Sequence, residues 1–223
     1  MPITPEQFAM HYPRLYHMAE AGVWPSIEKH GLLSTTALLD LFEINGDLRR
    51  AIETKHRPES VTVTHPRHGK AVIRDQKPMR ESALRKCLRG IKPQQWYEML
   101  NGRVFFWVTL ERVQTLLNAR AYRAREHTVI TVETAPFVAK YAPHMLLSPI
   151  NSGSTIYNPQ RRGSETFRPF DQYPFEQRRK LRGLRNAIAE AAVIHAVPDL
   201  RDFTVRVEYR KADRVLGVIY ARP

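Results

Sequence analysis

The chain has very little cysteine and no long apolar run. Its single cysteine, Cys87, cannot form a disulfide within the chain and excludes a multi-cysteine zinc site. No stretch approaches the run of about 20 apolar residues that a membrane-spanning helix needs, and the N-terminus lacks the apolar region of a signal peptide. We therefore expect a soluble protein of the reducing cytoplasm, without a membrane partner.

Glycine patterns that cradle phosphates are also missing. None of the ten glycines stands in a GxG, GxxxxGK[ST] or GxSxG pattern. This excludes Rossmann and P-loop nucleotide binding and the nucleophile elbow of serine hydrolases. His65 and His68 flank a predicted turn without a neighbouring cysteine or acidic cluster. We interpret them as solvated turn residues and expect no metal.

What the chain does have is an excess of positive charge. Its 223 residues include 35 Lys and Arg against 22 Asp and Glu, a net charge of +13. Residues 54–103 hold 12 basic and 4 acidic side chains, residues 161–186 hold 8 and 3, and the remainder is balanced. Two basic segments on a neutral body are typical of a surface that binds nucleic acid. The alternative is a solvated basic face that only keeps the protein soluble.

Hydrophobic periodicity predicts an α+β domain. The first expected elements are a strand over 14–17, a helix from near Val23 to Gly31, and a helix over 37–53 that Thr36 caps and that Asn45 and Gly46 interrupt. A hairpin of 61–65 with 71–74 follows, and then helices within 80–90 and 93–100. The next element is a strand over 104–108 that is covered on both faces. A helix over 110–118, a strand over 128–133, a loop over 148–173, strand signals over 187–197 and a final hairpin of 203–210 with 214–222 follow. Helices are thus expected early and the sheet is completed late.

Three segments resemble one known family. Residues 15–35 carry Tyr16, His17, Ser26, Ile27, Gly31, Leu32 and Leu33 at matching places; residues 104–108 form an aromatic strand; and residues 189–207 contain Glu190 in a closing motif. In this order they resemble the DarT-like ADP-ribosyltransferases, toxins that transfer ADP-ribose from NAD to nucleic-acid bases. The sequence departs from the family pattern at Ala19, over residues 109–119 and over residues 54–103.

The resemblance implies an ADP-ribosyltransferase-like fold, with a split mixed or antiparallel sheet and helices packed around it. It implies a single domain over 1–223, with a basic insertion of a hairpin and helices at about 54–103. NAD would be a substrate, and no metal would take part. Glu190 would be catalytic, whereas the NAD site would include Tyr16, His17, Met18, Phe105, Phe106, Ser154 and Tyr157. The alternatives are a rim or Arg185-paired Glu190 and a core histidine at His17.

The basic residues before Glu190 suggest the acceptor. The candidate nucleic-acid contacts are Arg161, Arg162, Arg178, Arg179, Lys180 and Arg182. Four aromatic residues between them, Phe167, Phe170, Tyr173 and Phe175, offer faces for unpaired bases. The prediction is therefore a bacterial toxin or defence effector that modifies single-stranded DNA or RNA, with an antitoxin protein as a candidate partner. Two alternatives stay open: a non-catalytic nucleic-acid-binding protein, and a transferase acting on protein or a terminal phosphate.

Overall fold

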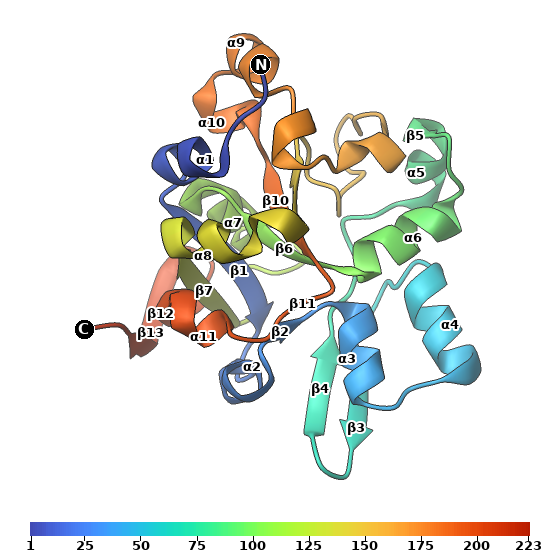
Figure 1. Cartoon of the computed structure of the whole chain (residues 1–223). Coiled ribbons are helices and arrows are strands. Elements are labelled where there is room, and N and C mark those ends of the chain that lie inside the picture. The colour runs from blue at the N-terminus through green and yellow to red at the C-terminus, as the bar shows by residue number, and fades with distance from the viewer.

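A seven-stranded antiparallel sheet runs through the middle of the molecule, which we describe over all 223 residues from a computed structural model (Figure 1). Its strand order is β13-β12-β7-β1-β6-β10-β8. The strands are β1 (Arg14–Glu20), β6 (Arg103–Trp107), β7 (His127–Glu133), β8 (Met145–Ser148), β10 (Glu190–Ile194), β12 (Thr204–Lys211) and β13 (Arg214–Ala221). Three two-stranded sheets pair β2 (Leu32–Leu33) with β11 (Ala196–Val197), β3 (Val61–His65) with β4 (Gly69–Ile73), and β5 (Leu88–Arg89) with β9 (Arg162–Gly163).

The chain has eleven helices, which pack on this sheet or in the part of the molecule beside it. They are α1 (Pro5–His11), α2 (Trp24–His30), α3 (Thr35–Leu41), α4 (Gly46–Thr54), α5 (Glu81–Cys87), α6 (Pro93–Asn101), α7 (Leu110–Leu117), α8 (Thr134–Tyr141), α9 (Phe175–Arg182), α10 (Leu184–Ala187) and α11 (Leu200–Phe203). Short 3-10 turns cover Ala142–His144, Ser164–Thr166 and Phe170–Gln172. None of the helices is long and apolar enough to cross a membrane.

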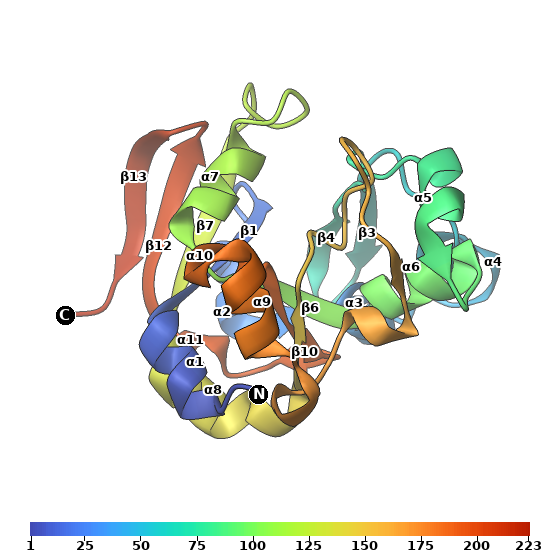
Figure 2. The ribbon, with the colours of Figure 1, turned by 90° about the horizontal axis from the view of Figure 1, so that it is seen from above.

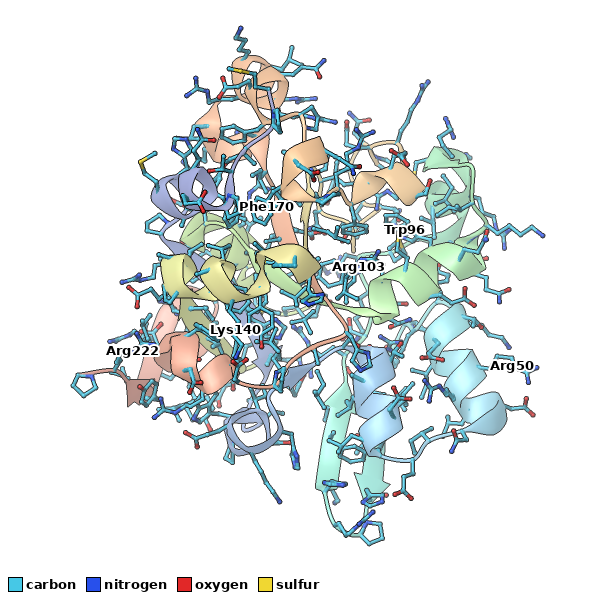
Figure 3. The ribbon with its side chains drawn as sticks, in the orientation of Figure 1. Arg50, Trp96, Arg103, Lys140, Phe170 and Arg222 are labelled. Atoms are coloured by element: carbon cyan, nitrogen blue, oxygen red, sulfur yellow. The ribbon has the colours of Figure 1, made fainter.

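The two faces of the sheet bury different side chains. On one face, Leu15, Phe106 and Ile130 belong to the main core, which α1, α8 and α11 cover (Figure 2). On the other face, Met18 and Val129 pack against α7 in a smaller cluster. This alternation is the period of two that any strand imposes. Phe170 is buried in the main core and Arg222 is exposed near the C-terminus; both are labelled in Figure 3.

Residues 54–103 pack beside the sheet and lead directly into β6. The β3–β4 hairpin shares an apolar cluster with α3 and α4 that includes Leu39, Phe42 and Ile73. A second cluster joins α5 and α6 to the sheet through Trp96 and Phe105. Figure 2 shows this part as a separate lobe on the β6 side of the molecule. The predicted hairpin and helices of this segment are therefore present.

The α+β class, the hairpins and the break at Asn45 and Gly46 are confirmed, but some local predictions were wrong. Ser34, not Thr36, caps α3: its Oγ accepts a hydrogen bond from the Ala37 amide at 3.1 Å. Helices are not concentrated early, since α8 to α11 lie in the second half. The helices α1, α8, α10 and α11 were not predicted.

Gly31 ends α2 at a close approach to the backbone before α11. Its φ is +76°, and a Cβ there would lie 2.3 Å from Pro198 Cα and 2.5 Å from the Val197 carbonyl oxygen. Gly31→Ala is expected to lower the free energy of unfolding by about 3–4 kcal/mol, because left-handed strain and a backbone clash add. Gly22→Ala is the matched control: its φ is +78° with no atom within 4 Å, so about 1–2 kcal/mol is expected. Equal losses in urea unfolding would contradict the clash.

Candidate active site

The central sheet splits between β1 and β6. The two strands are paired only at Tyr16 and Trp107, whereas β1 pairs with β7 along its whole length and β6 pairs with β10 over five residues. Beyond that single pair, His17 bridges the gap: its Nδ1 lies 2.8 Å from the Phe105 carbonyl oxygen. The split expected from the resemblance is therefore present, in a sheet that is antiparallel throughout.

A cleft of about 480 Å³ opens at this split. This volume lies within the range of small-molecule sites, roughly 300–1,000 Å³. Its walls come from the end of β1 and the turn after it, from α2 to α3, from β4 and residues 74–76, from β6, and from residues 151–153. Glu190 and His17 both line it, so residues 173 positions apart in the chain share one cavity.

Glu190 is a buried acid at the start of β10. Only 4% of its surface is exposed, and its two carboxylate oxygens lie 3.2 and 3.1 Å from the Ser152 amide nitrogen, which donates to them. It faces Trp107 on β6 and Ser148 on β8. Burial raises the pKa of Glu190 to about 7, against smaller opposing effects of the Ser152 hydrogen bonds and of nearby arginines.

Arg162 holds the residue that binds Glu190. The Arg162 guanidinium is buried and donates to the Ser152 carbonyl oxygen at 2.9 Å, so it holds the same residue whose amide binds Glu190. It also lies over the ring of Trp96, 5.7 Å from the ring centroid. Arg162 was predicted to bind nucleic acid, but these contacts place its side chain in the interior, where a phosphate at the protein surface would not reach it. Nor does Arg185 pair with Glu190; its partner is Glu111 at 3.3 Å.

His17 is held as a neutral ring with one free nitrogen. Burial lowers the pKa of His17 to about 4, so the ring is uncharged at neutral pH. Because the Phe105 carbonyl can only accept, Nδ1 carries the proton. Nε2 is therefore an acceptor, and the only hydrogen bond of this side chain is the one from Nδ1. A ligand hydroxyl in the cleft could donate to this nitrogen.

The aromatic residues of β6 have different roles. Phe106 is fully buried in the main core, where it packs on Phe137 with 5.2 Å between ring centroids. Phe105 is half-buried and packs on Phe167 at 5.8 Å. Both contribute to the cleft wall, as does Trp107, which shares a face with Glu190. Trp107 was not among the predicted site residues, although its place in the aromatic strand was the available signal.

Of the other predicted NAD contacts, only Met18 lines the cleft. Met18 lines the cleft with part of its residue, but its side chain is buried under α7, and Tyr16 does not line it. Ser154 is half-buried near the Pro78 carbonyl, and Tyr157 is 96% exposed; neither lines the cleft. The loop reaches the cleft instead through Asn151, Ser152 and Gly153. Ser152 was missed because it acts through its main chain, which leaves no side-chain signal.

Residues 74–76 add a polar wall that the sequence did not indicate. Arg74 donates to the Met18 carbonyl oxygen at 3.0 Å, and its guanidinium lies over Tyr122, 5.0 Å from the ring centroid. Tyr122 in turn donates to Asp75 at 2.8 Å. The basic segment thus closes one side of the cleft. No group of three or more histidine, cysteine, aspartate or glutamate side chains is arranged to hold a metal ion.

The second basic segment is divided between surface and interior. Arg179, Lys180 and Arg182 are exposed on α9, together with the half-buried Arg178 and with Arg161 in the preceding loop. Helix α9 and α10 protrude at one end of the molecule, directly before β10 (Figure 1). The predicted stacking faces are wrong, because all four side chains are buried: Phe167, Phe170, Tyr173 and Phe175.

Comparison with known proteins gives a family and a distant structural likeness. Residues 13–204 match the model of a family described as a family of unknown function (DUF7002). No curated protein matches the sequence. Among solved structures, Thermosipho africanus DarTG in complex with ADP-ribose aligns with a TM-score of 0.45 and 14% identity, over 88% of this chain and 43% of its own.

The raised pKa of Glu190 predicts a stability cost that depends on pH. The carboxyl titrates at about 7 in the folded protein against an ordinary 4.5, so native stability is lost as pH rises through this window. Glu190→Gln, neutral at every pH, should resemble wild type at pH 5 and exceed its unfolding free energy by on the order of 3 kcal/mol at pH 8. Urea unfolding at both pH values measures this. A difference that does not grow with pH would contradict the buried, perturbed carboxyl.

Proposed function

Because this chain belongs to DUF7002, a family of unknown function, we propose its activity from its own geometry: it is an ADP-ribosyltransferase that uses NAD. The observation that carries the proposal is a buried carboxyl and a neutral histidine facing one cleft at a split in the sheet. This is the arrangement expected from the resemblance of residues 15–35 and 189–207 to DarT-like enzymes. The fold alone would not support an activity, since one fold hosts many.

In the proposed reaction, the bond between the nicotinamide nitrogen and ribose C1′ of NAD breaks. Its electron pair leaves with nicotinamide, which becomes neutral, and C1′ takes on oxocarbenium-like positive charge. Glu190 supplies a carboxylate in a water-poor setting, where charge stabilisation is strong. A cation at C1′ also favours the ionised form of Glu190, so the acid is poised where its charge is needed.

Three further residues would contact NAD, and two others would hold Glu190 in place. Nε2 of His17 would accept a hydrogen bond from a ribose hydroxyl, because its neutral tautomer leaves this lone pair free. The Ser152 amide donates to the Glu190 carboxylate and would hold it at the cleft wall, and Arg162 holds Ser152 through its carbonyl oxygen. The aromatic wall of Phe105 and Trp107 would face the flat nicotinamide ring.

For the acceptor, we propose a base of single-stranded DNA or RNA. The exposed cations of α9 support this choice, because phosphates reward clustered arginine and lysine. The acceptor nitrogen would attack C1′ and pass its proton to Glu190, which closes the balance of the reaction. A base must leave its stack to reach such a cavity.

The catalytic prediction concerns Glu190. Glu190→Gln is expected to lower transfer of labelled ADP-ribose from NAD to single-stranded oligonucleotides by at least about 10³-fold, since the neutral amide neither stabilises C1′ nor takes the proton. Binding of NAD should change by only a few fold. The control is Glu165→Gln, which removes an exposed carboxyl. Label on protein or on a terminal phosphate would redirect the acceptor, and no label in wild type would refute the transferase.

The acceptor prediction concerns α9. Replacing Arg178, Arg179 and Arg182 with alanine should reduce the slope of log affinity against log salt for single-stranded oligonucleotides by about 2, at about 0.7 per phosphate contact. Fluorescence anisotropy across a salt series measures the slope. Lys140→Ala/Arg222→Ala is the control, because both side chains lie away from α9 (Figure 3). An unchanged slope in the α9 variant would mean that α9 does not touch phosphate.

A further inference from the structure

A second hollow lies in residues 54–103, apart from the cleft. It is bounded by the end of α4, by α5 and by the start of α6. Its lining residues are Thr54, Lys55, His56, Glu81, Arg85, Lys92, Pro93, Gln94 and Tyr97. None of them lines the cleft, although the neighbouring Arg57 and Gln76 do. His56 donates from Nε2 to the Gln76 carbonyl at 3.1 Å, so one thin layer of chain separates the two cavities.

Tyr97 brings an unsatisfied hydroxyl to this hollow. Its side chain is 1% exposed, and its hydroxyl has no hydrogen-bond partner. A buried hydroxyl without a partner costs free energy, and such groups are rare in folded proteins. Burial also raises the pKa of Tyr97 to about 12, so the group remains a donor at neutral pH. A ligand with an acceptor oxygen would satisfy it.

The charges around Tyr97 select an anion. Lys55 and Lys92 are exposed, and neither ammonium group forms an ion pair. Glu81 is the one acid in the lining, and Arg85 neutralises it through an ion pair. Two unpaired positive charges therefore remain in the lining of the hollow that Tyr97 shares.

The first turn of α6 adds to this positive field. Helix α6 has nine residues and begins at Pro93, beside the hollow. The Lys92 amide is satisfied by Gln95 Oε1 at 2.8 Å, but amides further into the first turn have no acceptor within the helix. The helix dipole points its positive end at the same place.

We propose that this hollow binds a phosphate of a nucleic-acid backbone, with the Tyr97 hydroxyl donating to a phosphate oxygen and Lys55 and Lys92 neutralising its charge. A polymeric ligand is favoured over a single phosphate because the hollow lies in the segment with 12 basic against 4 acidic residues. Further phosphates of the same strand would meet those cations. The proposal concerns binding alone and does not depend on the transferase activity.

The test measures single-stranded oligonucleotide binding by anisotropy across a salt series, without NAD and in the Glu190→Gln background, so that transfer plays no part. Lys55→Ala/Lys92→Ala should reduce the salt slope by about 1.4, for two contacts at about 0.7 each. Tyr97→Phe removes only the hydroxyl and should weaken binding about tenfold without changing the slope, because no charge is lost. Lys140→Ala/Arg222→Ala is the control for two cations elsewhere and should leave both quantities near wild type.

Each remaining outcome would overturn the proposal. If Lys55→Ala/Lys92→Ala reduces the salt slope but Tyr97→Phe binds as wild type does, the two lysines act as diffuse surface charge and the hollow is not a binding pocket. An effect equal to that of the Lys140 and Arg222 control would mean general electrostatics. Inorganic phosphate is the second probe: if it protects wild type but not Tyr97→Phe against thermal unfolding while oligonucleotide binding is the same in both, the hollow takes free phosphate and not nucleic acid.

Discussion

The hydrogen bond from His17 to the Phe105 carbonyl is the contact on which the cavity depends. Two neighbouring strands of a sheet normally satisfy each other's backbone groups along their length. Here β1 and β6 meet at one residue pair, and the imidazole occupies part of the space that main-chain hydrogen bonds would otherwise fill. The same bond sets the tautomer of His17 and so leaves Nε2 as an acceptor without a partner in the protein. One hydrogen bond therefore both bridges the split between β1 and β6 and fixes the acceptor nitrogen of His17.

Burial of Glu190 has a free-energy cost for the folded protein. An acid on a strand flanked by Ala189 and Ala191 loses its hydration, and two long hydrogen bonds from one amide replace it only in part. The rest of the sheet is well packed and can offset this cost. In the proposed reaction, the positive charge that develops at C1′ would favour the ionised carboxylate. Functional sites commonly combine perturbed acids and buried support in this way.

The basic segment of residues 54–103 has two sides. Toward the sheet, Arg74 and Asp75 close the cleft through contacts with Met18 and Tyr122. Away from the sheet, Tyr97 faces a basic hollow. One lobe therefore contributes to the wall of the cleft and presents positive charge outside it, and the proposed transfer to a nucleic acid would need both features.

The sequence by itself determined the local elements, the uneven distribution of charge and the two motifs containing His17 and Glu190, because hydrophobic period, turn residues and motif order are written in neighbouring residues. Only the tertiary structure decided which of these residues meet. Ser152 reaches the site through its main-chain amide, and the Arg74 side chain reaches it through the Met18 carbonyl. Arg162 and the aromatic residues near it turned inward where charge and motif predicted exposure. Burial depends on what packs against a side chain from distant segments, and that information lies in the folded arrangement and not in any local pattern.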